Sequence, residues 1–330
     1  MKYYHSLGFS CYVLLCFTKR ACKSGTLAGR LQRRCFTCSG SIAIPGKWDA
    51  FHIGHRRLVE VASSLGNPVL VTFENMASVL GWPSRPPLVA RDFASRILCS
   101  WEEELSLGPI KLQVIPFERV RYMEPKLFLD FLRLQLGFEG LVCGEDWRFG
   151  YQAQGDIDLL KNYCAENNWK YRIVGPVYVH DILVSSTVVR QYLAKGQMEA
   201  VSLLLGRHYC VVGKVVDKRK RHCYVSELIN QLPATAIYEA VIEQHKHCYI
   251  HVINEERDKN SCILIDNFTL DHSLHLGQQV DIHIIRKVLS HSTNYLNIIF
   301  QFCLYIEEQH LKLFLHDRVL SHTPQQPHRR

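Results

Sequence analysis

The sequence predicts an α/β fold in which a doubly wound parallel sheet is followed by a small antiparallel β-barrel. From Ser41 onward, short apolar runs alternate with longer amphipathic ones, which is typical of strand and helix units in a parallel sheet. Right-handed crossovers place the ligands of such a sheet at the carboxyl ends of its strands. After Gly206 the apolar pattern changes to period two, which favours the barrel.

The apolar runs, the amphipathic runs and the period-two pattern predict the following strands and helices. The strands expected in the parallel sheet are Ser41–Ile44, Pro68–Phe73, Lys111–Ile115, Gly140–Cys143 and Tyr171–Val174. The helices expected around it are Ile53–Leu65, Arg91–Leu105, Pro125–Leu136, Asp156–Asn167, Ser185–Ala194 and Met198–Leu205. The barrel strands expected after them are Tyr209–Val216, Ile237–Ile242, Cys248–Ile253, Cys262–Ile265, Val280–Ile285 and Tyr295–Phe302.

A chain of 330 residues exceeds one typical hydrophobic core, so we expect two domains and a tail. The boundaries we predict are a leader over 1–40, the α/β domain over 41–207, the barrel over 208–305 and a polar tail over 306–330.

The net charge of +8 is concentrated in the leader, which holds seven basic and no acidic residues and leaves 32 basic against 31 acidic residues for the rest. A nearly neutral body argues against nucleic-acid binding, because a duplex binder needs a basic stripe on its folded surface. The short run 218–221 is read as a solvated turn.

A basic, acid-free leader rich in serine and threonine has the composition of an organelle transit peptide, removed after import. A secretory signal is the alternative, because Phe9–Phe17 is a short apolar run behind Lys2. That run is too short to cross a bilayer and no later stretch is long enough, so we expect no membrane partner.

Five of the thirteen cysteines lie in the leader, and the other eight are scattered without a C-x-x-C pair. This spacing supports neither a zinc site nor a redox motif, and buried thiols are expected. A cluster of His245, His247, Cys248 and His251 is weighed as a metal site, but strand alternation explains it better as a polar outer face.

The chemistry is expected at the end of the first strand, where Gly46–His55 reads G-K-W-D-A-F-H-I-G-H and leads into a helix. Gly46 permits a tight turn and Gly54 permits close approach of a ligand to the backbone. His52 and His55 can face one anion at a helix N-terminus, donating hydrogen bonds and, when protonated, charge. The alternative is that one histidine caps the helix while the other packs.

A second phosphate-binding segment is expected at Ser185–Arg190. Ser185, Ser186 and Thr187 open a helix and offer hydroxyl and N–H groups, and Arg190 offers a planar fork one turn later. Taken alone, this segment could simply cap a surface helix.

These motifs resemble those of the prokaryotic-type FAD synthetases, including their plant chloroplast relatives, within the H-x-G-H nucleotidyltransferase superfamily. The first loop is similar to their G-x-F-D-G-x-H-x-G-H, with Trp48 in place of Phe and Ala50 in place of Gly. Gly144–Gly150 reads G-E-D-W-R-F-G, like their G-x-[DN]-[FY]-x-F-G, and Ser185–Arg190 matches S-S-T-x-[IV]-R. The resemblance covers 41–207.

The resemblance implies transfer of AMP from ATP to FMN, giving FAD and pyrophosphate, with Mg²⁺ held on the phosphates largely through water and no protein metal site. It assigns catalysis to His52, His55 and Arg190, and the FMN pocket to Asp146, Phe149 and Phe73. The residues that it assigns to ATP are Gly46, Asp49, His52, Gly54, His55, Ser185, Ser186, Thr187 and Arg190. The plant-like segment Thr72–Trp82 favours a plastid enzyme, with the mitochondrion as the alternative.

Bacterial members carry a riboflavin kinase barrel that begins with a loop containing G-F-P-T-A-N. Tyr209–Val216 resembles the first strand of that barrel, but Asp217–Leu232 contains no glycine. We therefore expect a degenerate barrel without kinase activity. Two functional alternatives stay open: adenylyl transfer to another phosphate acceptor, and a non-catalytic flavin or nucleotide binder.

Overall fold

The computed structural model describes residues 40–218, 222–242, 246–254, 261–266 and 274–288. The chain divides into two compact units, Met1–Lys287 and Val288–Arg330. The first unit holds both the sheet and the barrel. The leader, the strand predicted at 295–302 and the tail predicted at 306–330 lie outside the described residues, so these expectations stay predictions.

The predicted doubly wound sheet is confirmed. Its five strands are all parallel and lie in the order β3-β2-β1-β4-β5. Their bounds are β1 Ser41–Pro45, β2 Asn67–Glu74, β3 Lys111–Pro116, β4 Gly140–Gly144 and β5 Lys170–Val174. Each lies within one residue of its predicted position at either end. The order changes direction between β1 and β4, and ligands of open α/β sheets bind beyond the strand ends at that point.

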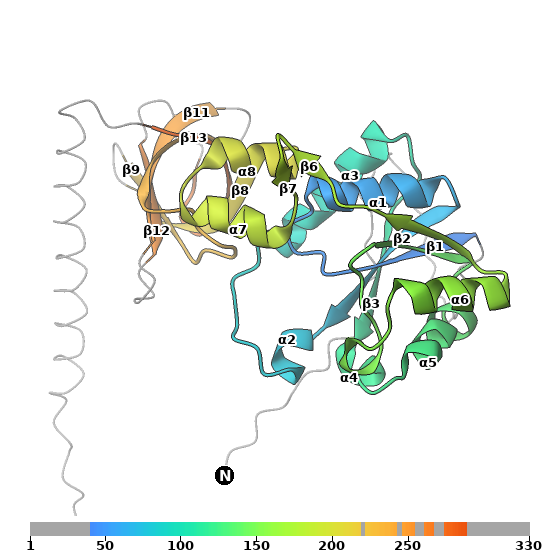
Figure 1. Cartoon of the computed structure of the whole chain (residues 1–330). Helices are drawn as coiled ribbons and strands as arrows, with labels where there is room; N and C mark the ends of the chain where they lie inside the picture. The colour runs from blue at the N-terminus through green and yellow to red at the C-terminus, as the bar shows by residue number, and fades with distance from the viewer. Residues whose placement is uncertain (1–39, 219–221, 243–245, 255–260, 267–273, 289–330) are drawn as a thin grey trace, which may run out of the picture. The chain divides into compact units, whose positions relative to one another are not determined.

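Helices cover both faces of this sheet (Figure 1). α1 (Ile53–Ser63) and α3 (Arg91–Glu104) lie on one face, where Ile42 and Ile44 of β1 pack with Val59 and Phe93. On the other face lie α4 (Phe117–Val120), α5 (Pro125–Asp130) with a π-helical turn over Phe131–Gln135, and α6 (Ile157–Asn167). Ala43 of β1 points to that second face, as strand alternation requires.

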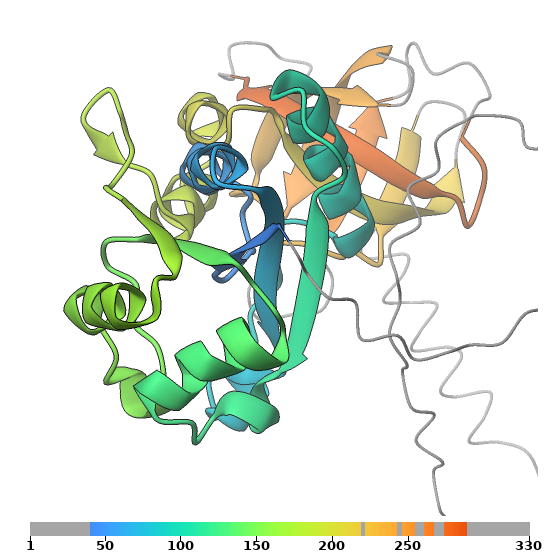
Figure 2. The same cartoon turned by 90° about the vertical axis from the view of Figure 1, so that its right-hand side faces the viewer.

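The barrel is closed, with the strand order β10-β11-β12-β9-β8-β13 (Figure 2). The strands are β8 Tyr209–Lys218, β9 His222–Ser226, β10 Ala236–Ile242, β11 Lys246–Ile253, β12 Cys262–Asp266 and β13 Gln279–Lys287. Alternation along β11 is as predicted, because Cys248, Ile250 and Val252 are buried while Tyr249 is 54% exposed. β9 was not predicted, because its five residues follow a basic run and carry only a short apolar signal.

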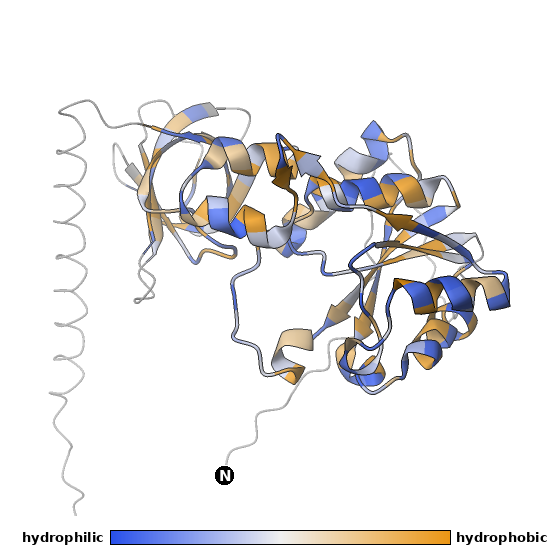
Figure 3. Cartoon of the chain, in the orientation of Figure 1, coloured by the Kyte–Doolittle hydropathy of each residue, from blue (hydrophilic) through white to orange (hydrophobic). Residues whose placement is uncertain are grey.

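Two helices lie between the sheet and the barrel. The predicted boundary at residue 207 assigns α7 (Ser186–Ala194) and α8 (Met198–Leu205) to the α/β domain and stays a prediction, and their apolar side chains share a core with the barrel interior. Val189 and Leu193 of α7 share this core with Tyr209 and Tyr238. In Figure 3 both helices and the barrel strands carry orange, apolar residues. These helices therefore pack with the barrel.

The remaining elements are short and were not predicted: α2 (Met76–Val79), a 3-10 turn over Tyr151–Ala153, and the hairpin of β6 (Tyr178–Val179) with β7 (Ile182–Leu183). Elements of two to four residues carry no detectable periodicity. Five of the seven cysteines in the described region are buried, as expected. No helix of the described region is long and apolar enough to span a bilayer.

Candidate active site

The loop between β1 and α1 places His52 at the start of the helix. Phe51 adopts a left-handed conformation with φ 48°, which turns the chain before the helix begins. His52 is the N-cap, and its Nδ1 accepts a hydrogen bond from the His55 backbone N–H at 3.2 Å. A neutral imidazole that accepts through Nδ1 carries its proton on Nε2. His52 therefore caps the helix and keeps Nε2–H as a donor.

The rings of His52 and His55 are stacked, with centroids 3.8 Å apart and planes inclined by 10°. Trp48 lies on His55, with a centroid separation of 4.8 Å. A Cβ on Gly54 would lie 3.1 Å from His52 Nδ1, so glycine at this position makes room for the imidazole. The sequence predicted that Gly54 would admit a ligand to the backbone, and the structure gives it this additional, internal role.

The pKa values of both histidines are lowered, which favours neutral rings at pH 7. Loss of hydration lowers the pKa of His52 to about 4, and the nearby positive charge of Arg207 adds to the shift, while Asp49 opposes it. Loss of hydration also lowers the pKa of His55 well below its usual value, together with the charges of His52 and Arg207. The pair thus presents hydrogen-bond donors at pH 7, and the charge that was expected of it applies only to the protonated form.

Arg207 is a feature of this loop that the sequence did not point to. Its guanidinium donates to the Ala50 carbonyl at 2.8 Å, the Phe51 carbonyl at 2.6 Å and the Leu205 carbonyl at 3.1 Å. Burial lowers its pKa to about 10, which leaves it charged at pH 7. This cation fixes the backbone just before His52 from a position more than 150 residues away, and no local motif marks it.

Ser185–Arg190 lies directly beside the histidine loop, as predicted for a second phosphate segment. Ser185 is the N-cap of α7 and accepts from the Val188 N–H at 3.2 Å. Ser186 is partly buried and Thr187 is exposed at the first turn. A Cβ on Gly54 would also contact the Val184 side chain at 3.8 Å, so the two helix starts are neighbours.

Arg190 and Asp49 form the strongest link between the two segments. Arg190 Nη2 lies 2.6 Å from Asp49 Oδ2 in a partly buried ion pair. Its Nη1 donates to the Pro86 carbonyl at 3.0 Å and to the Gln231 side chain. Asp49 Oδ1 accepts from the Leu88 N–H at 2.9 Å. The sequence predicted a planar guanidinium fork for phosphate oxygens, and in the structure three of its five N–H groups have partners within the described residues.

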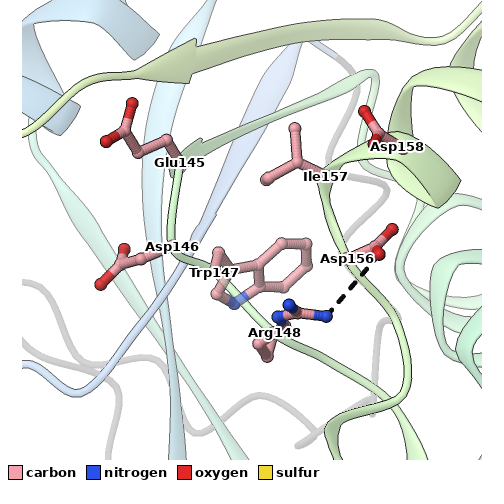
Figure 4. A pocket seen from close by; sticks show the side chains of 7 residues that line it. All are labelled: Glu145, Asp146, Trp147, Arg148, Asp156, Ile157 and Asp158. Carbon is pink, nitrogen blue, oxygen red and sulfur yellow. Dashed lines mark ion pairs between the residues drawn. The ribbon is translucent and has the colours of Figure 1, made fainter.

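The predicted flavin segment follows β4 and surrounds a cavity of about 360 Å³, lined by Glu145, Asp146, Trp147, Arg148, Asp156, Ile157 and Asp158 (Figure 4). Asp146 is exposed at its edge, and Arg148 pairs with Asp156 at 3.6 Å. Phe149 is only 5% exposed and stacks on Trp147 at 4.4 Å. Phe73 packs beside Phe117 and Phe128. Phe149 is a core residue, and Trp147 is the aromatic side chain that lines the cavity.

Two further residues complete the loop. The chain bends at Gly46 without a left-handed φ, and a Cβ built there would lie 3.7 Å from Trp48 Nε1, an ordinary contact. Lys47 was not proposed, and its ammonium lies 4.2 Å from the centre of the Trp82 ring. Partial burial lowers the Lys47 pKa. This places one more cation at the carboxyl end of β1.

A β3-β2-β1-β4-β5 sheet with H-x-G-H between β1 and α1, and with S-S-T-x-x-R at the start of α7, defines an α/β nucleotidyltransferase. Comparison with known proteins narrows this class. Residues 37–188 match the family described as FAD synthetase. Over these residues the chain is similar to the FAD synthetases, as its motifs predicted.

Two similar proteins carry the same name as the matched family. FAD synthetase 1, chloroplastic, and FAD synthetase 2, chloroplastic, of Arabidopsis thaliana are 35% and 37% identical over 225 residues, covering 61% and 62% of this chain. The alignments span 63% and 61% of those relatives, a little over three fifths of their length. A bifunctional riboflavin kinase/FMN adenylyltransferase of Bacillus subtilis is 23% identical over 279 residues, 76% of this chain and 84% of its own.

A solved structure described as a macrolide-efflux protein of Streptococcus pneumoniae has the same fold. It superposes with a TM-score of 0.65 over 81% of this chain and 92% of its own, at 20% identity. Its coverage extends the likeness of fold beyond the α/β domain.

Proposed function

We propose that this chain is an FMN adenylyltransferase, which transfers AMP from ATP to FMN and releases pyrophosphate. The observation that carries the proposal is the juxtaposition of the two phosphate-binding segments, joined by the Asp49–Arg190 pair at 2.6 Å within an FAD synthetase domain. Donors from both helix starts then converge on one site at the carboxyl end of β1. This arrangement suits a triphosphate, which offers acceptor oxygens on every side.

In the reaction, an FMN phosphate oxygen attacks the α-phosphorus of ATP in line with the departing pyrophosphate. The Nε2–H of His52 donates to the charge that develops on the phosphate oxygens, and His55 supports it from the stacked position. An approaching triphosphate favours the imidazolium form, so the pKa values of both histidines rise on binding. Catalysis rests on positioning and electrostatics and needs no covalent intermediate.

Mg²⁺ enters this reaction as part of the substrate, the MgATP complex. Asp49 is the one carboxylate of the histidine loop, and both of its oxygens already accept bonds from Leu88 and Arg190. The loop therefore does not fit a protein-held Mg²⁺, which prefers several oxygen ligands. We propose that the ion is held on the phosphates, and that the histidine and arginine donors act on the oxygens that it leaves open.

A panel of acceptors tests the function. The purified chain is incubated with MgATP and FMN, riboflavin, nicotinamide mononucleotide or phosphopantetheine, and nucleotide products and pyrophosphate are separated. We expect FAD and equimolar pyrophosphate from FMN alone. A product from another phosphate acceptor would support the broader adenylyltransferase alternative, and no product from any acceptor would support a binding protein without turnover.

We also propose that the barrel lacks riboflavin kinase activity. Such a kinase holds ATP phosphates with convergent backbone N–H groups of a flexible loop, and Asp217–Leu232 offers no glycine for that purpose. In the same panel, riboflavin should yield neither FMN nor FAD. FMN formed from riboflavin would contradict the monofunctional interpretation.

For location, we propose import into a plastid, with a mitochondrion as the alternative. The proposal rests on the basic, acid-free leader and on similarity to relatives that are named chloroplastic. A fluorescent fusion of residues 1–45 should enter the organelle, whereas a fusion in which the seven basic residues are replaced by glutamine should stay outside. Cytosolic fluorescence from the unmodified fusion would contradict the proposal.

A further inference from the structure

We propose that the barrel is a positioning element of the adenylyl-transfer site, and that Gln231 is the residue through which it orients Arg190. The inference rests on the proposed function and gives the barrel a role that does not depend on kinase chemistry. It follows from three contacts that the barrel segment between β9 and β10 makes: with Arg190, with the loop at Leu88 and with the end of α7.

The first contact is direct. The Gln231 side-chain carbonyl, from the segment between β9 and β10, accepts a hydrogen bond from Arg190 Nη1. The Gln231 backbone is itself fixed at both ends, because its N–H donates to the Pro87 carbonyl at 2.9 Å and its carbonyl accepts from the Tyr209 hydroxyl at 2.6 Å. Gln231 therefore offers Arg190 a hydrogen-bond acceptor on a fixed backbone. The bond turns Nη2 toward Asp49 and leaves Nε–H and one Nη2–H for a phosphate.

The second contact fixes the loop that completes the Arg190 site. Asn230 is 3% exposed, and its side chain spans the two domains. Its Oδ1 accepts from the Val212 N–H at 2.9 Å, while its Nδ2 donates to the Leu88 carbonyl at 3.2 Å and the Cys210 carbonyl at 2.8 Å. Leu88 in turn donates its N–H to Asp49. The chain of bonds runs from the barrel strand β8 to the carboxylate that pairs with Arg190.

The third contact holds the far end of α7. The Ala234 N–H donates to the Leu193 carbonyl at 3.2 Å. Gly196 follows the helix with a left-handed φ of 69°, and a Cβ there would lie 2.5 Å from the Tyr238 hydroxyl. Val189 and Leu193 are fully buried in the core that the barrel shares. The helix that presents Ser185 and Arg190 is therefore seated on the barrel rather than on the sheet.

These contacts predict a specific consequence for catalysis. A guanidinium that must find its own orientation loses entropy when ATP binds, whereas one already held by Gln231 and Asp49 does not. Removing the Gln231 acceptor should weaken ATP binding and leave FMN binding unchanged, because Gln231 acts on Arg190 alone among the proposed site residues.

The experiment compares Gln231→Ala with Gln279→Ala, an exposed glutamine at the start of β13 that serves as the matched control. Steady-state kinetics and calorimetric titration with MgATP are measured for each. We expect the KM and Kd for ATP to rise about tenfold in Gln231→Ala, as loss of a charge-assisted hydrogen bond suggests, with the KM for FMN unchanged. Gln279→Ala should match the unsubstituted protein, and thermal unfolding should be similar in all three.

A double-mutant cycle separates positioning from general stabilisation. If Gln231 acts through Arg190, Gln231→Ala should have no further effect on the Kd for ATP in an Arg190→Ala background. Equal effects in both backgrounds, or unchanged ATP affinity in Gln231→Ala, would overturn the proposal. If the unsubstituted chain binds MgATP but makes no FAD, the proposed function fails while the binding cycle still decides the role of Gln231.

Discussion

The histidine loop and Ser185–Arg190 lie side by side, but they are built in different ways. Trp48 and Phe51 anchor the loop in the core between the sheet and helices α1 and α3. His52 caps α1, which follows the loop. Val189 anchors the second segment in the barrel core, and Arg190 depends on partners 41 and 141 residues away. One half of the site is thus shaped mostly by its own sequence, and the other by tertiary packing.

The largest effect is expected from the locally built half. His52→Ala removes both the helix cap and the Nε2–H donor, so turnover with FMN and ATP should fall by about 10²-fold or more. Comparison of kcat and KM for His52→Ala and His55→Ala measures this loss. His275→Ala, an exposed histidine beside the barrel, is the control. Near-normal kcat in both variants would contradict the assignment of charge stabilisation to the loop.

A stability effect should follow from the neutral state of His52. The folded state keeps the His52 pKa at about 4, below the ordinary 6.5, so the unfolded chain binds this proton first as the pH falls. The free energy of unfolding should drop through the window from pH 6.5 to about 4, by roughly 2 kcal/mol between pH 7 and pH 5 from this group.

His52→Gln keeps an acceptor for the helix cap but cannot titrate, so it should show a correspondingly smaller drop. Urea unfolding at pH 7 and pH 5 measures the difference. Equal pH dependence in both proteins would show that His52 is hydrated and charged in the folded state.

A smaller effect is expected at Arg207, which follows α8 and holds the backbone of the histidine loop. Arg207→Lys keeps the charge but loses the planar fork that reaches the Ala50 and Phe51 carbonyls. We expect kcat to fall about tenfold with a modest loss of stability, because the backbone before His52 is no longer fixed. An Arg207→Lys protein with unchanged kcat would mean that the histidine loop holds its own geometry. The loop would then differ even more from Ser185–Arg190, which depends on tertiary packing.

The sequence predicts well those features that depend on residues close together in the chain. Short apolar runs located all five sheet strands, amphipathic patterns located α1, α3 and α6, and the motif G-K-W-D-A-F-H-I-G-H located the loop. Contacts between distant residues leave no such pattern. Arg207, the Asp49–Arg190 pair and the seat of α7 on the barrel depend on residues that only the fold brings together.

Burial and hydration also lie beyond the sequence. Trp147 and Phe149 were both considered as contacts of a flavin or adenine ring, and only the fold shows that Phe149 is buried while Trp147 lines the cavity. The histidines were expected to donate hydrogen bonds and, when protonated, charge, and only the fold shows that loss of hydration favours the neutral rings. Neither burial nor hydration can be read from spacing alone, because both depend on what the rest of the chain places nearby.

The most direct test of adenylyl transfer follows the phosphorus atoms of ATP. The full chain is incubated with FMN and ATP labelled on the α-phosphate, and separately with ATP labelled on the γ-phosphate; both reactions are repeated with riboflavin. With FMN, the α label should appear in FAD and the γ label in pyrophosphate, and with riboflavin no label should reach a flavin. A γ label on FMN formed from riboflavin, or an absence of α label in FAD when FMN is supplied, would contradict the account.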